Sequence, residues 1–590
     1  MPQNLLRQPN FTALVALVWL LVALALLLQH WAQTAQTLLD TDDAMRLVEL
    51  RAWLSGPGLL AGWFDLHQAR LQPPLGYDPH WSRLIDASLA GLFAVFKLAG
   101  DPPAAERLMR AWWPLLWLLP TIAGMVAIAW RIAGREAATV ALLLALVGVP
   151  AYQQFTPGRI DHHNVQIALT LLIAAATVWS DRRQWCATVA GALSGLALAI
   201  GFESLPYLAV CGGVLALRHV RDRNAGPALI EYGLALAAST AVAFVLSVGP
   251  ARWSVSQCDA IAINSTAGAV CAGLVLALVG WLSHSQAVTR AFAIVGAGGA
   301  ALAVALLLEP RCIRGPFALV DPAIWPIWHE HVRELQSLAA VFRVNPLTAA
   351  GIAAFPAAAA LAALVLTGDW MRRRDFGFLA AAAVFLVAAG TTIAAVRGYS
   401  YAMWLGMPLV AAVAPRLFTA LRLRTLPARL AAAMMLTPMA VSVCAITIAH
   451  ATGLDDADSF ARPASRHCLN SASYIALARL PAGLVATDIS YGPFLLAMTP
   501  HAAMAAPYHR LGPGIVAAHG ALASPPDEAH RIMARAGANY VMVCGPRPPD
   551  GLAEPARSRS LWGRLQAGAV PGWLEPVPGM QPFAVYRIRS

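Results

Sequence analysis

Long apolar runs, separated by short polar segments, dominate this chain of 590 residues. A helix that crosses a bilayer needs about 20 consecutive apolar residues, and thirteen runs reach or approach that length. They cover residues 11–30, 107–130, 137–155, 164–180, 186–201, 205–217, 227–249, 263–282, 291–308, 346–367, 376–395, 401–415 and 430–450. Only 12% of the residues are charged, against roughly 25% in an average soluble domain. The sequence therefore predicts a polytopic α-helical membrane protein with about 13 transmembrane helices.

Two of these runs need separate comment. The first is longer than the roughly 7–15 apolar residues of a signal-peptide core, so we expect it to be retained as a span. The short runs on either side of residues 202–204 are open to two interpretations. They are either two spans or one broken helix.

Basic residues lie in short clusters between the apolar runs, and the formal net charge is +11. They form no single patch interleaved with aromatic residues, so no nucleic acid partner is predicted. Cytoplasmic loops of membrane proteins carry an excess of Lys and Arg. An N-terminus in the cytoplasm places every cluster there and everything after His450 outside. We therefore expect a multi-pass protein of the inner (plasma) membrane, in contact with membrane lipids, with a periplasmic or extracellular C-terminal domain. The clusters are residues 131–135, 181–183, 218–223, 372–374 and 416–429.

The same alternation places two long loops and the tail outside. The first loop, residues 31–106, contains an amphipathic stretch at 83–100 that is suited to the membrane surface. The second loop covers residues 309–345. We predict a transmembrane domain at 1–450 and a soluble extracytoplasmic α/β domain at 451–590. In the latter, a helical stretch at 526–536 is surrounded by β-like runs at 484–488, 539–544 and 583–588.

The eight cysteines show neither a CxxC motif nor zinc-ligand spacing. Cys258 with Cys312, and Cys468 with Cys544, are able to pair on an oxidising side of the membrane. Free thiols are an equal alternative.

Three of the four residues in Asp40-Thr41-Asp42-Asp43 are acidic. Such carboxylates repel one another unless a cation neutralises them, and oxygen ligands suit a hard divalent metal ion. The alternative is a helix cap for the following residues, since Asp is a common N-cap.

The segment Arg159-Ile160-Asp161-His162-His163-Asn164 lies at the outer end of an apolar run. Asp161 can cap the helix that follows. Ionisable groups at a membrane are costly, however, and usually mark a functional path or a partner. Beside the acidic cluster, this segment suggests a second set of metal ligands.

The loop 309–345 carries Asp321, His329, Glu330, His331, Arg333 and Glu334. A zinc protease is not predicted, because its H-E-x-x-H motif needs histidines four residues apart. Arg397 lies at the outer end of another run, where it either binds an anionic group such as phosphate or extends to the interface. Glu203, between two short spans, is a further candidate for a site role or a buried partner.

The order of these motifs, followed by an outer soluble domain, resembles the catalytic subunit of oligosaccharyltransferase. That enzyme is a member of the C-type (GT-C) glycosyltransferase superfamily. The resemblance covers nearly the whole chain as architecture, but matching residues are confined to short motifs. It implies a glycosyltransferase whose donor is a sugar linked to a polyprenyl phosphate or pyrophosphate.

The resemblance also implies site residues. Asp42 or Asp43, Asp161 and Glu334 would surround Mg²⁺ or Mn²⁺, and these carboxylates are the predicted catalytic residues. Our predicted metal ligands are Asp43, Asp161, Glu334 and His163. The predicted phosphate-binding residues are Arg397, His162 and Arg159, although either histidine can serve metal or phosphate.

The tail departs from the family. The family reads its acceptor peptide with a Trp-Trp-Asp-Tyr-Gly motif, whose nearest counterpart here is residues 488–492, Asp-Ile-Ser-Tyr-Gly. Both tryptophans are missing, and Ser490 replaces the aspartate. The acceptor is therefore a protein, a lipid or a polysaccharide. The predicted acceptor- or donor-binding residues are Tyr491, Asp488, His501, Tyr508, His509 and Arg510.

Two other functions remain open. One is transfer of a single sugar from a polyprenyl monophosphate to a lipid or polysaccharide. The other is a transporter or lipid flippase, which would place charges near the membrane midplane.

Overall fold

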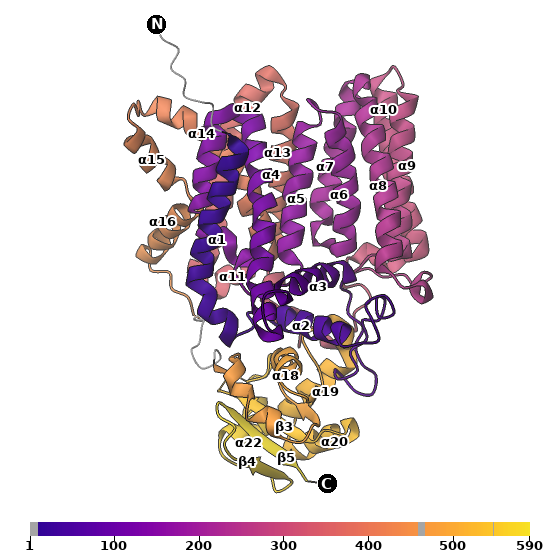
Figure 1. Cartoon of the computed structure of the whole chain (residues 1–590), viewed down its shortest axis with the longest axis vertical. Helices are drawn as coiled ribbons and strands as arrows, with labels where there is room; N and C mark the ends of the chain where they lie inside the picture. The colour runs from indigo at the N-terminus through magenta and orange to yellow at the C-terminus, as the bar shows by residue number, and fades with distance from the viewer. Residues whose placement is uncertain (1–9, 458–466, 547, 590) are drawn as a thin grey trace.

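The computed structural model describes residues 10–457, 467–546 and 548–589. A bundle of long, roughly parallel helices forms one part of the molecule, and a smaller α/β body lies at one end of it (Figure 1). The helices α2 (Thr41–Leu54) and α3 (Arg83–Lys97) cross that end of the bundle, between the long helices and the α/β body (Figure 1). Part of the predicted tail, residues 458–466, lies outside the described residues.

Every predicted apolar run contributes a helix to the bundle. Its helices are α1 (Phe11–Gln36), α4 (Pro102–Leu146), α5 (His163–Trp179), α6 (Trp185–Ile200), α7 (Leu205–Arg221), α8 (Gly226–Ser247), α9 (Ile263–Leu282), α10 (Ala287–Leu308), α12 (Pro346–Arg373), α13 (Phe376–Ala394), α14 (Tyr399–Ala420), α15 (Leu426–Met435) and α16 (Pro438–Ala451). The runs around residues 202–204 are two helices, α6 and α7, joined by the short 3₁₀ helix η2 (Phe202–Ser204).

Among the described residues, eight helices are long and apolar enough to cross a membrane, or nine if the bent pair α15 and α16 is one span. The difference from thirteen has physical causes. Helix α4 holds two predicted spans, which meet at a break in the backbone at Ala133 and Gly134. Helices α5, α6 and α7 have only 16 or 17 residues each. The chain is thus a mostly helical protein of several apolar helices, and the count of thirteen spans stays a prediction.

One predicted span, residues 137–155, is too long. Helix α4 ends at Leu146, and the chain continues as the 3₁₀ helix η1 (Val149–Phe155). Gly148 and Pro150 account for the end, because glycine is a poor helix former and proline removes a backbone donor.

The first outer loop folds into two helices, α2 (Thr41–Leu54) and α3 (Arg83–Lys97). The amphipathic stretch predicted at 83–100 is confirmed as α3. Asp86 joins the two helices, because it accepts hydrogen bonds from Arg46 (3.0 Å) and Arg83 (3.1 Å). All three side chains are at most 1% exposed. Charges buried to this extent are tolerated only when they are paired, so these ion pairs hold α2 in place.

The C-terminal residues form a five-stranded mixed sheet in the order β2-β1-β3-β5-β4. Strand β1 pairs in parallel with β2 and β3, while β5 runs antiparallel to β3 and β4. The three predicted β-like runs are confirmed as β1, β3 and β5, and the helix predicted at 526–536 is α20. The elements are β1 (Leu484–Ala486), α18 (Gly492–Met498), β2 (Ala502–Ala503), α19 (Gly512–Ala523), α20 (Pro526–Ala536), β3 (Tyr540–Cys544), α21 (Ala556–Arg559), α22 (Leu561–Gln566), β4 (Leu574–Val577) and β5 (Phe583–Ile588).

The first outer loop continues this sheet at its β2 edge. Leu71 pairs in parallel with Ala503. Beside it, the Arg70 side chain donates hydrogen bonds to the carbonyl oxygens of Leu496, Thr499 and His501. The α/β body is therefore fixed directly to the loop that carries the acidic cluster.

Two disulfides are present, and both are the pairs considered from the sequence. Cys258–Cys312 joins the α8–α9 connection to the start of the second outer loop, and Cys468–Cys544 lies within the α/β body. The other four cysteines are free.

Candidate active site

The turn that carries Asp161 is shaped by glycine and by Asp43. Gly158 has a φ of 106°, a conformation that side chains disfavour, and its N–H donates to the carbonyl of Arg110 (2.9 Å). Downstream, Oδ1 of Asp43 accepts the backbone N–H groups of Ile160 (2.8 Å) and Asp161 (3.0 Å). Asp43 thereby fixes the position of Asp161.

Arg159 joins the two acidic segments predicted from the sequence. Its guanidinium lies 2.8 Å from Asp40, 3.1 Å from Asp43 and 3.7 Å from Asp161. Residues separated by more than 110 positions in the chain are therefore neighbours at the end of the bundle.

Two imidazoles face Asp161. The ring nitrogen Nδ1 of His162 contacts Oδ1 of Asp161. Nε2 of His163 lies 3.1 Å from the other oxygen, Oδ2. One ligand atom from each of the three residues lies within 4.8 Å of the others. This arrangement is suited to a metal ion, since carboxylate oxygen and imidazole nitrogen are both common ligands.

Glu203 contacts His163 at the ring nitrogen that lies away from Asp161 and so orients the ring. Its carboxylate lies 2.9 Å from Nδ1 of His163 and accepts hydrogen bonds from Nε of Arg397 (2.7 Å) and from the Tyr401 hydroxyl. With Nδ1 directed to Glu203, Nε2 is directed to Asp161. Metal-bound histidines are commonly held by a carboxylate in this way. The sequence singled out Glu203 as a lone acid between spans, but its partners lie far away in the chain.

Glu334 completes the cluster from the second outer loop. It lies in the 3₁₀ helix η8 (Arg333–Leu335), 3.6 Å from Arg397 and 3.9 Å from Nε2 of His163. Its side chain is 44% exposed. The backbone N–H of Val396 donates to the carbonyl of Gln336 (2.9 Å), which ties this loop to the residue next to Arg397.

Asp42 and Asp43 have different environments. Asp43 is fully buried and is occupied by backbone donors and Arg159, whereas Asp42 is partly exposed. Burial raises the pKa of Asp43 to about 7. Burial, together with the charges of Asp161 and Asp40, raises the pKa of Asp42 well above its usual range. Glu334 and His163 also act on Asp42. Asp43 therefore supports the turn, while the side chain of Asp42 stays partly exposed.

The cluster fits a divalent cation. Six carboxylates from four segments meet two arginines and two histidines in the described part of the chain. The carboxylate of Asp161 is buried, and its two oxygens contact nitrogens of His162, His163 and Arg159. An excess of buried negative charge of this kind is relieved by a bound cation. The carboxylates are those of Asp40, Asp42, Asp43, Asp161, Glu203 and Glu334.

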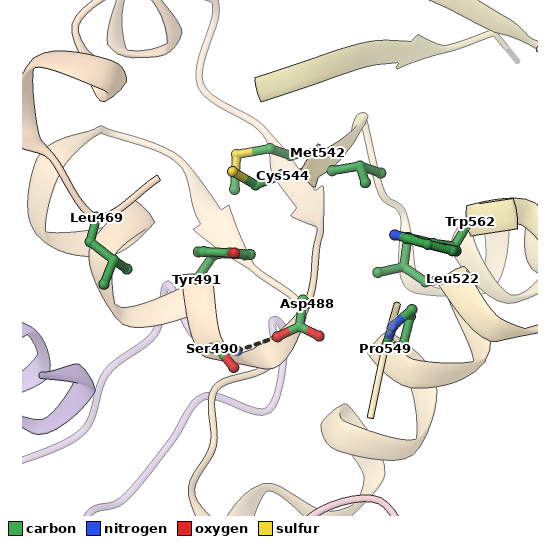
Figure 2. A pocket seen from close by; sticks show the side chains of 10 residues that line it. Leu469, Asp488, Ser490, Tyr491, Leu522, Met542, Cys544, Pro549 and Trp562 are labelled. Carbon is green, nitrogen blue, oxygen red and sulfur yellow. Dashed lines mark hydrogen bonds between the residues drawn. The ribbon is translucent and has the colours of Figure 1, made fainter. Parts of the chain in front are cut away.

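Two of the residues predicted to bind an acceptor or donor, Asp488 and Tyr491, line a cavity in the α/β body. Figure 2 shows Asp488 and Tyr491 on one side and Trp562 on the other. The cavity volume is about 160 Å³. A second, smaller cavity shares Asp488 and is also lined by Ile327 of the second outer loop.

The other predicted tail residues lie elsewhere. His501 is fully buried, and its two ring nitrogens contact the backbone N–H of Gly483 and the carbonyl of Leu477. The prediction that His501 contacts a substrate is therefore wrong for this structure, because the ring is enclosed in the core. Tyr508 donates to the carbonyl of Thr41 (2.9 Å), next to Asp42. His509 and Arg510 both contact Asp259 of the α8–α9 connection.

No protein-family model and no curated protein matches the sequence, but solved structures match the fold. The archaeal oligosaccharyltransferase AglB from Archaeoglobus fulgidus, in complex with an inhibitory peptide and a dolichol-phosphate, aligns over 92% of this chain and 70% of its own. The TM-score is 0.64 and the identity 12%. The apo form of the Archaeoglobus fulgidus oligosaccharyltransferase aligns over 92% of this chain and 70% of its own, with a TM-score of 0.60 and 13% identity.

A third structure of the Archaeoglobus fulgidus enzyme is a complex with Zn and sulfate. It aligns over 90% of this chain and 67% of its own, with a TM-score of 0.53 and 14% identity. Identities this low carry information about the fold alone. This chain has the fold of the archaeal oligosaccharyltransferase, which confirms at the level of the fold the resemblance predicted from its motifs.

Proposed function

We propose that this chain is a metal-dependent glycosyltransferase. It transfers a sugar or an oligosaccharide from a polyprenyl phosphate or pyrophosphate carrier to an acceptor on the extracytoplasmic side. One observation carries the proposal: the acidic cluster, Asp161 with its histidines, and Arg397 meet at one end of a bundle with the oligosaccharyltransferase fold. An AglB structure with this fold contains a dolichol-phosphate, which supports a polyprenyl-linked donor.

Each residue of the cluster has a proposed task. Asp42, Asp161, His163 and Glu334 hold Mg²⁺ or Mn²⁺. The bound ion acts as a Lewis acid for the charge that develops on the leaving phosphate. Asp43, which was predicted as a ligand and a catalytic residue, instead positions the Asp161 turn through its backbone hydrogen bonds. Asp42 is the proposed general base for the acceptor, because it is the partly exposed member of the pair.

Arg397 is the proposed phosphate-binding residue. Glu203 fixes its Nε, so the terminal nitrogens remain directed toward the side of Glu334. A guanidinium binds phosphate well because it presents paired donors in one plane. His162 and Arg159 also contact Asp161 and offer N–H donors for a second phosphate.

The acceptor is proposed to enter along the cavity lined by Asp488 and Tyr491. The cavity lacks the two tryptophans with which the family reads a peptide, so a lipid or polysaccharide acceptor is the second candidate. In that case a polyprenyl monophosphate would donate a single sugar. A transporter is not favoured, because the ionisable residues of the cluster lie at helix ends and in connections.

The test uses the full chain in membranes with labelled polyprenyl-linked glycans that carry one or two phosphates. We expect label to leave the carrier and enter protein, lipid or polysaccharide, and the labelled fraction identifies the acceptor class. Label that crosses the membrane while it stays on the carrier would identify a flippase instead. Label that remains on every donor in the presence of Mg²⁺ and of Mn²⁺ would reject the proposed function.

A further inference from the structure

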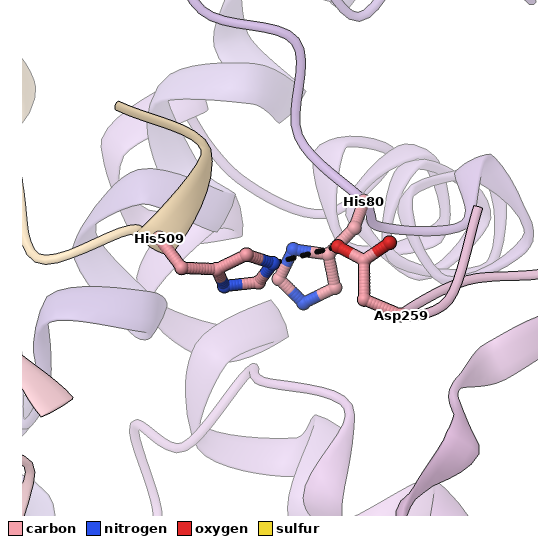
Figure 3. A group of neighbouring side chains, drawn as sticks. All are labelled: His80, Asp259 and His509. Carbon is pink, nitrogen blue, oxygen red and sulfur yellow. Dashed lines mark hydrogen bonds and ion pairs between the residues drawn. The ribbon is translucent and has the colours of Figure 1, made fainter. Parts of the chain in front are cut away.

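A second group of metal-ligating side chains lies outside the proposed active site. His80, Asp259 and His509 come from three separate segments: the first outer loop, the α8–α9 connection and the α/β body. One ligand atom from each lies within 4.8 Å of the other two. Figure 3 shows a ring nitrogen of His80 beside the contact between His509 and Asp259.

The side chains of Asp259, His509 and Arg510 are joined by short contacts. Nε2 of His509 lies 2.6 Å from Oδ2 of Asp259, and each of these side chains is 9% exposed. Arg510 donates two hydrogen bonds to the same carboxylate, from Nη2 to Oδ1 (2.7 Å) and from Nε to Oδ2 (2.9 Å). Asp259 is therefore held rigidly, with its charge balanced by Arg510.

His80 has a buried ring nitrogen, Nδ1, for which the described residues offer no hydrogen bond. A buried imidazole nitrogen without a partner is unfavourable. Its ring centre lies 5.0 Å from that of His509. A metal ion between the two rings would satisfy this nitrogen.

The two imidazoles and one carboxylate of this group favour zinc over Mg²⁺ or Ca²⁺. Two imidazoles and one carboxylate are typical of zinc, which binds three protein ligands and leaves a fourth position to water. Hydrogen bonds from Arg510 to the carboxylate match the outer support that such ligands usually have. Mg²⁺ and Ca²⁺ prefer sites made of oxygen atoms.

We propose that His80, Asp259 and His509 bind a zinc ion that fastens the α/β body to the two outer connections. On binding, the zinc ion takes the place of the hydrogen bond between His509 and Asp259, and the neutral imidazole of His509 carries its one proton on the ring nitrogen that does not bind zinc. The ion would stabilise a contact next to the active site, because Tyr508 precedes His509 and bonds to Thr41 beside Asp42. This site does not depend on the proposed transferase activity.

The experiment measures zinc in the purified full chain after dialysis against zinc-free buffer. The background variant is Asp161→Ala, which disables the active-site cluster so that zinc bound there is not counted. We expect one zinc per chain in Asp161→Ala. Adding His80→Ala or His509→Ala should remove that zinc or weaken its binding at least tenfold. The matched control is His67→Ala, since His67 lies on the same loop and also contacts a carboxylate, Asp78.

A second measurement guards against misfolding. Co²⁺ added to the Asp161→Ala chain should give the visible absorption of a tetrahedral site, and zinc should displace it. The milder variant His80→Gln should lose the spectrum while its elution on gel filtration stays unchanged. Absence of zinc and of the cobalt spectrum in the Asp161→Ala chain would overturn the proposal. Zinc affinity unchanged by His80→Ala and His509→Ala would do the same.

Discussion

Two clusters of histidine and carboxylate lie on the same side of this protein, and they differ in charge balance. Around Asp161, six carboxylates meet two arginines. Around Asp259, one carboxylate is matched by Arg510. The first cluster therefore needs a cation to offset repulsion among its acids. The second is neutral without one, and its attraction for a metal comes from imidazole nitrogens.

The difference separates two roles. A cluster with surplus negative charge, partly open through the exposed side chain of Glu334, is suited to an exchangeable hard ion that meets phosphate. A balanced, enclosed cluster between three segments is suited to holding those segments together. We expect substitutions in the first cluster to affect catalysis and substitutions around the second to affect stability.

The largest effect is expected from Asp161→Asn. This change removes a negative ligand with little change in shape, and metal stabilisation of a leaving group contributes several kcal/mol. Transfer of label should fall by about 10²- to 10³-fold. The folded fraction should stay the same, as measured by gel filtration. The matched control is Asp321→Asn, an acid of the same outer face that caps a 3₁₀ helix. Equal transfer activities of Asp161→Asn and Asp321→Asn would contradict a catalytic role for the cluster around Asp161.

A smaller effect is expected from Glu203→Gln. The amide keeps the shape but weakens the hold on His163 and Arg397, and loss of such a supporting carboxylate typically costs about 10- to 100-fold in metal affinity. The concentration of Mg²⁺ or Mn²⁺ that gives half-maximal transfer should rise accordingly.

Saturating metal should restore part of the activity of Glu203→Gln, which a general loss of folding would not allow. The control is Glu231→Gln, since Glu231 contacts the exposed polar side chains of Gln184 and Thr188 at another site. A metal requirement that is identical in Glu203→Gln and the unchanged chain would contradict the positioning role.

The smallest effect on transfer is expected from the double variant Cys258→Ser and Cys312→Ser. The disulfide closes a loop of 54 residues next to Asp259, and loss of a native disulfide costs about 2–4 kcal/mol of stability. The melting temperature in detergent should fall, while the rate of transfer at low temperature changes less than threefold. A large loss of transfer without a change in melting temperature would show that the second region acts in catalysis.

The sequence predicts the helices of the bundle better than it predicts the short strands. Apolar runs place the bundle helices, because a spanning helix must be continuously apolar. The three longer β-rich runs give β1, β3 and β5, but β2 has two residues and no detectable pattern. The acidic motifs indicate the chemistry of the site, since charge at a membrane requires a reason.

The details of the site depend on contacts between distant segments. Asp42 and Asp43 are adjacent in sequence, yet helix geometry directs them to different surroundings, and no pattern distinguishes them. Glu203 reaches Arg397 across 194 positions. His501 looked available because histidine is polar, but the fold encloses it between Gly483 and Leu477.

The central claim is that the carboxylates around Asp161 jointly hold one divalent ion. Electron paramagnetic resonance of Mn²⁺ added to the metal-free full chain tests this claim directly. We predict one bound Mn²⁺ per chain in the unchanged protein and in His80→Ala, with binding weakened at least tenfold in Asp42→Ala and Asp161→Ala. Mn²⁺ binding that is equally tight in all four proteins would contradict the account.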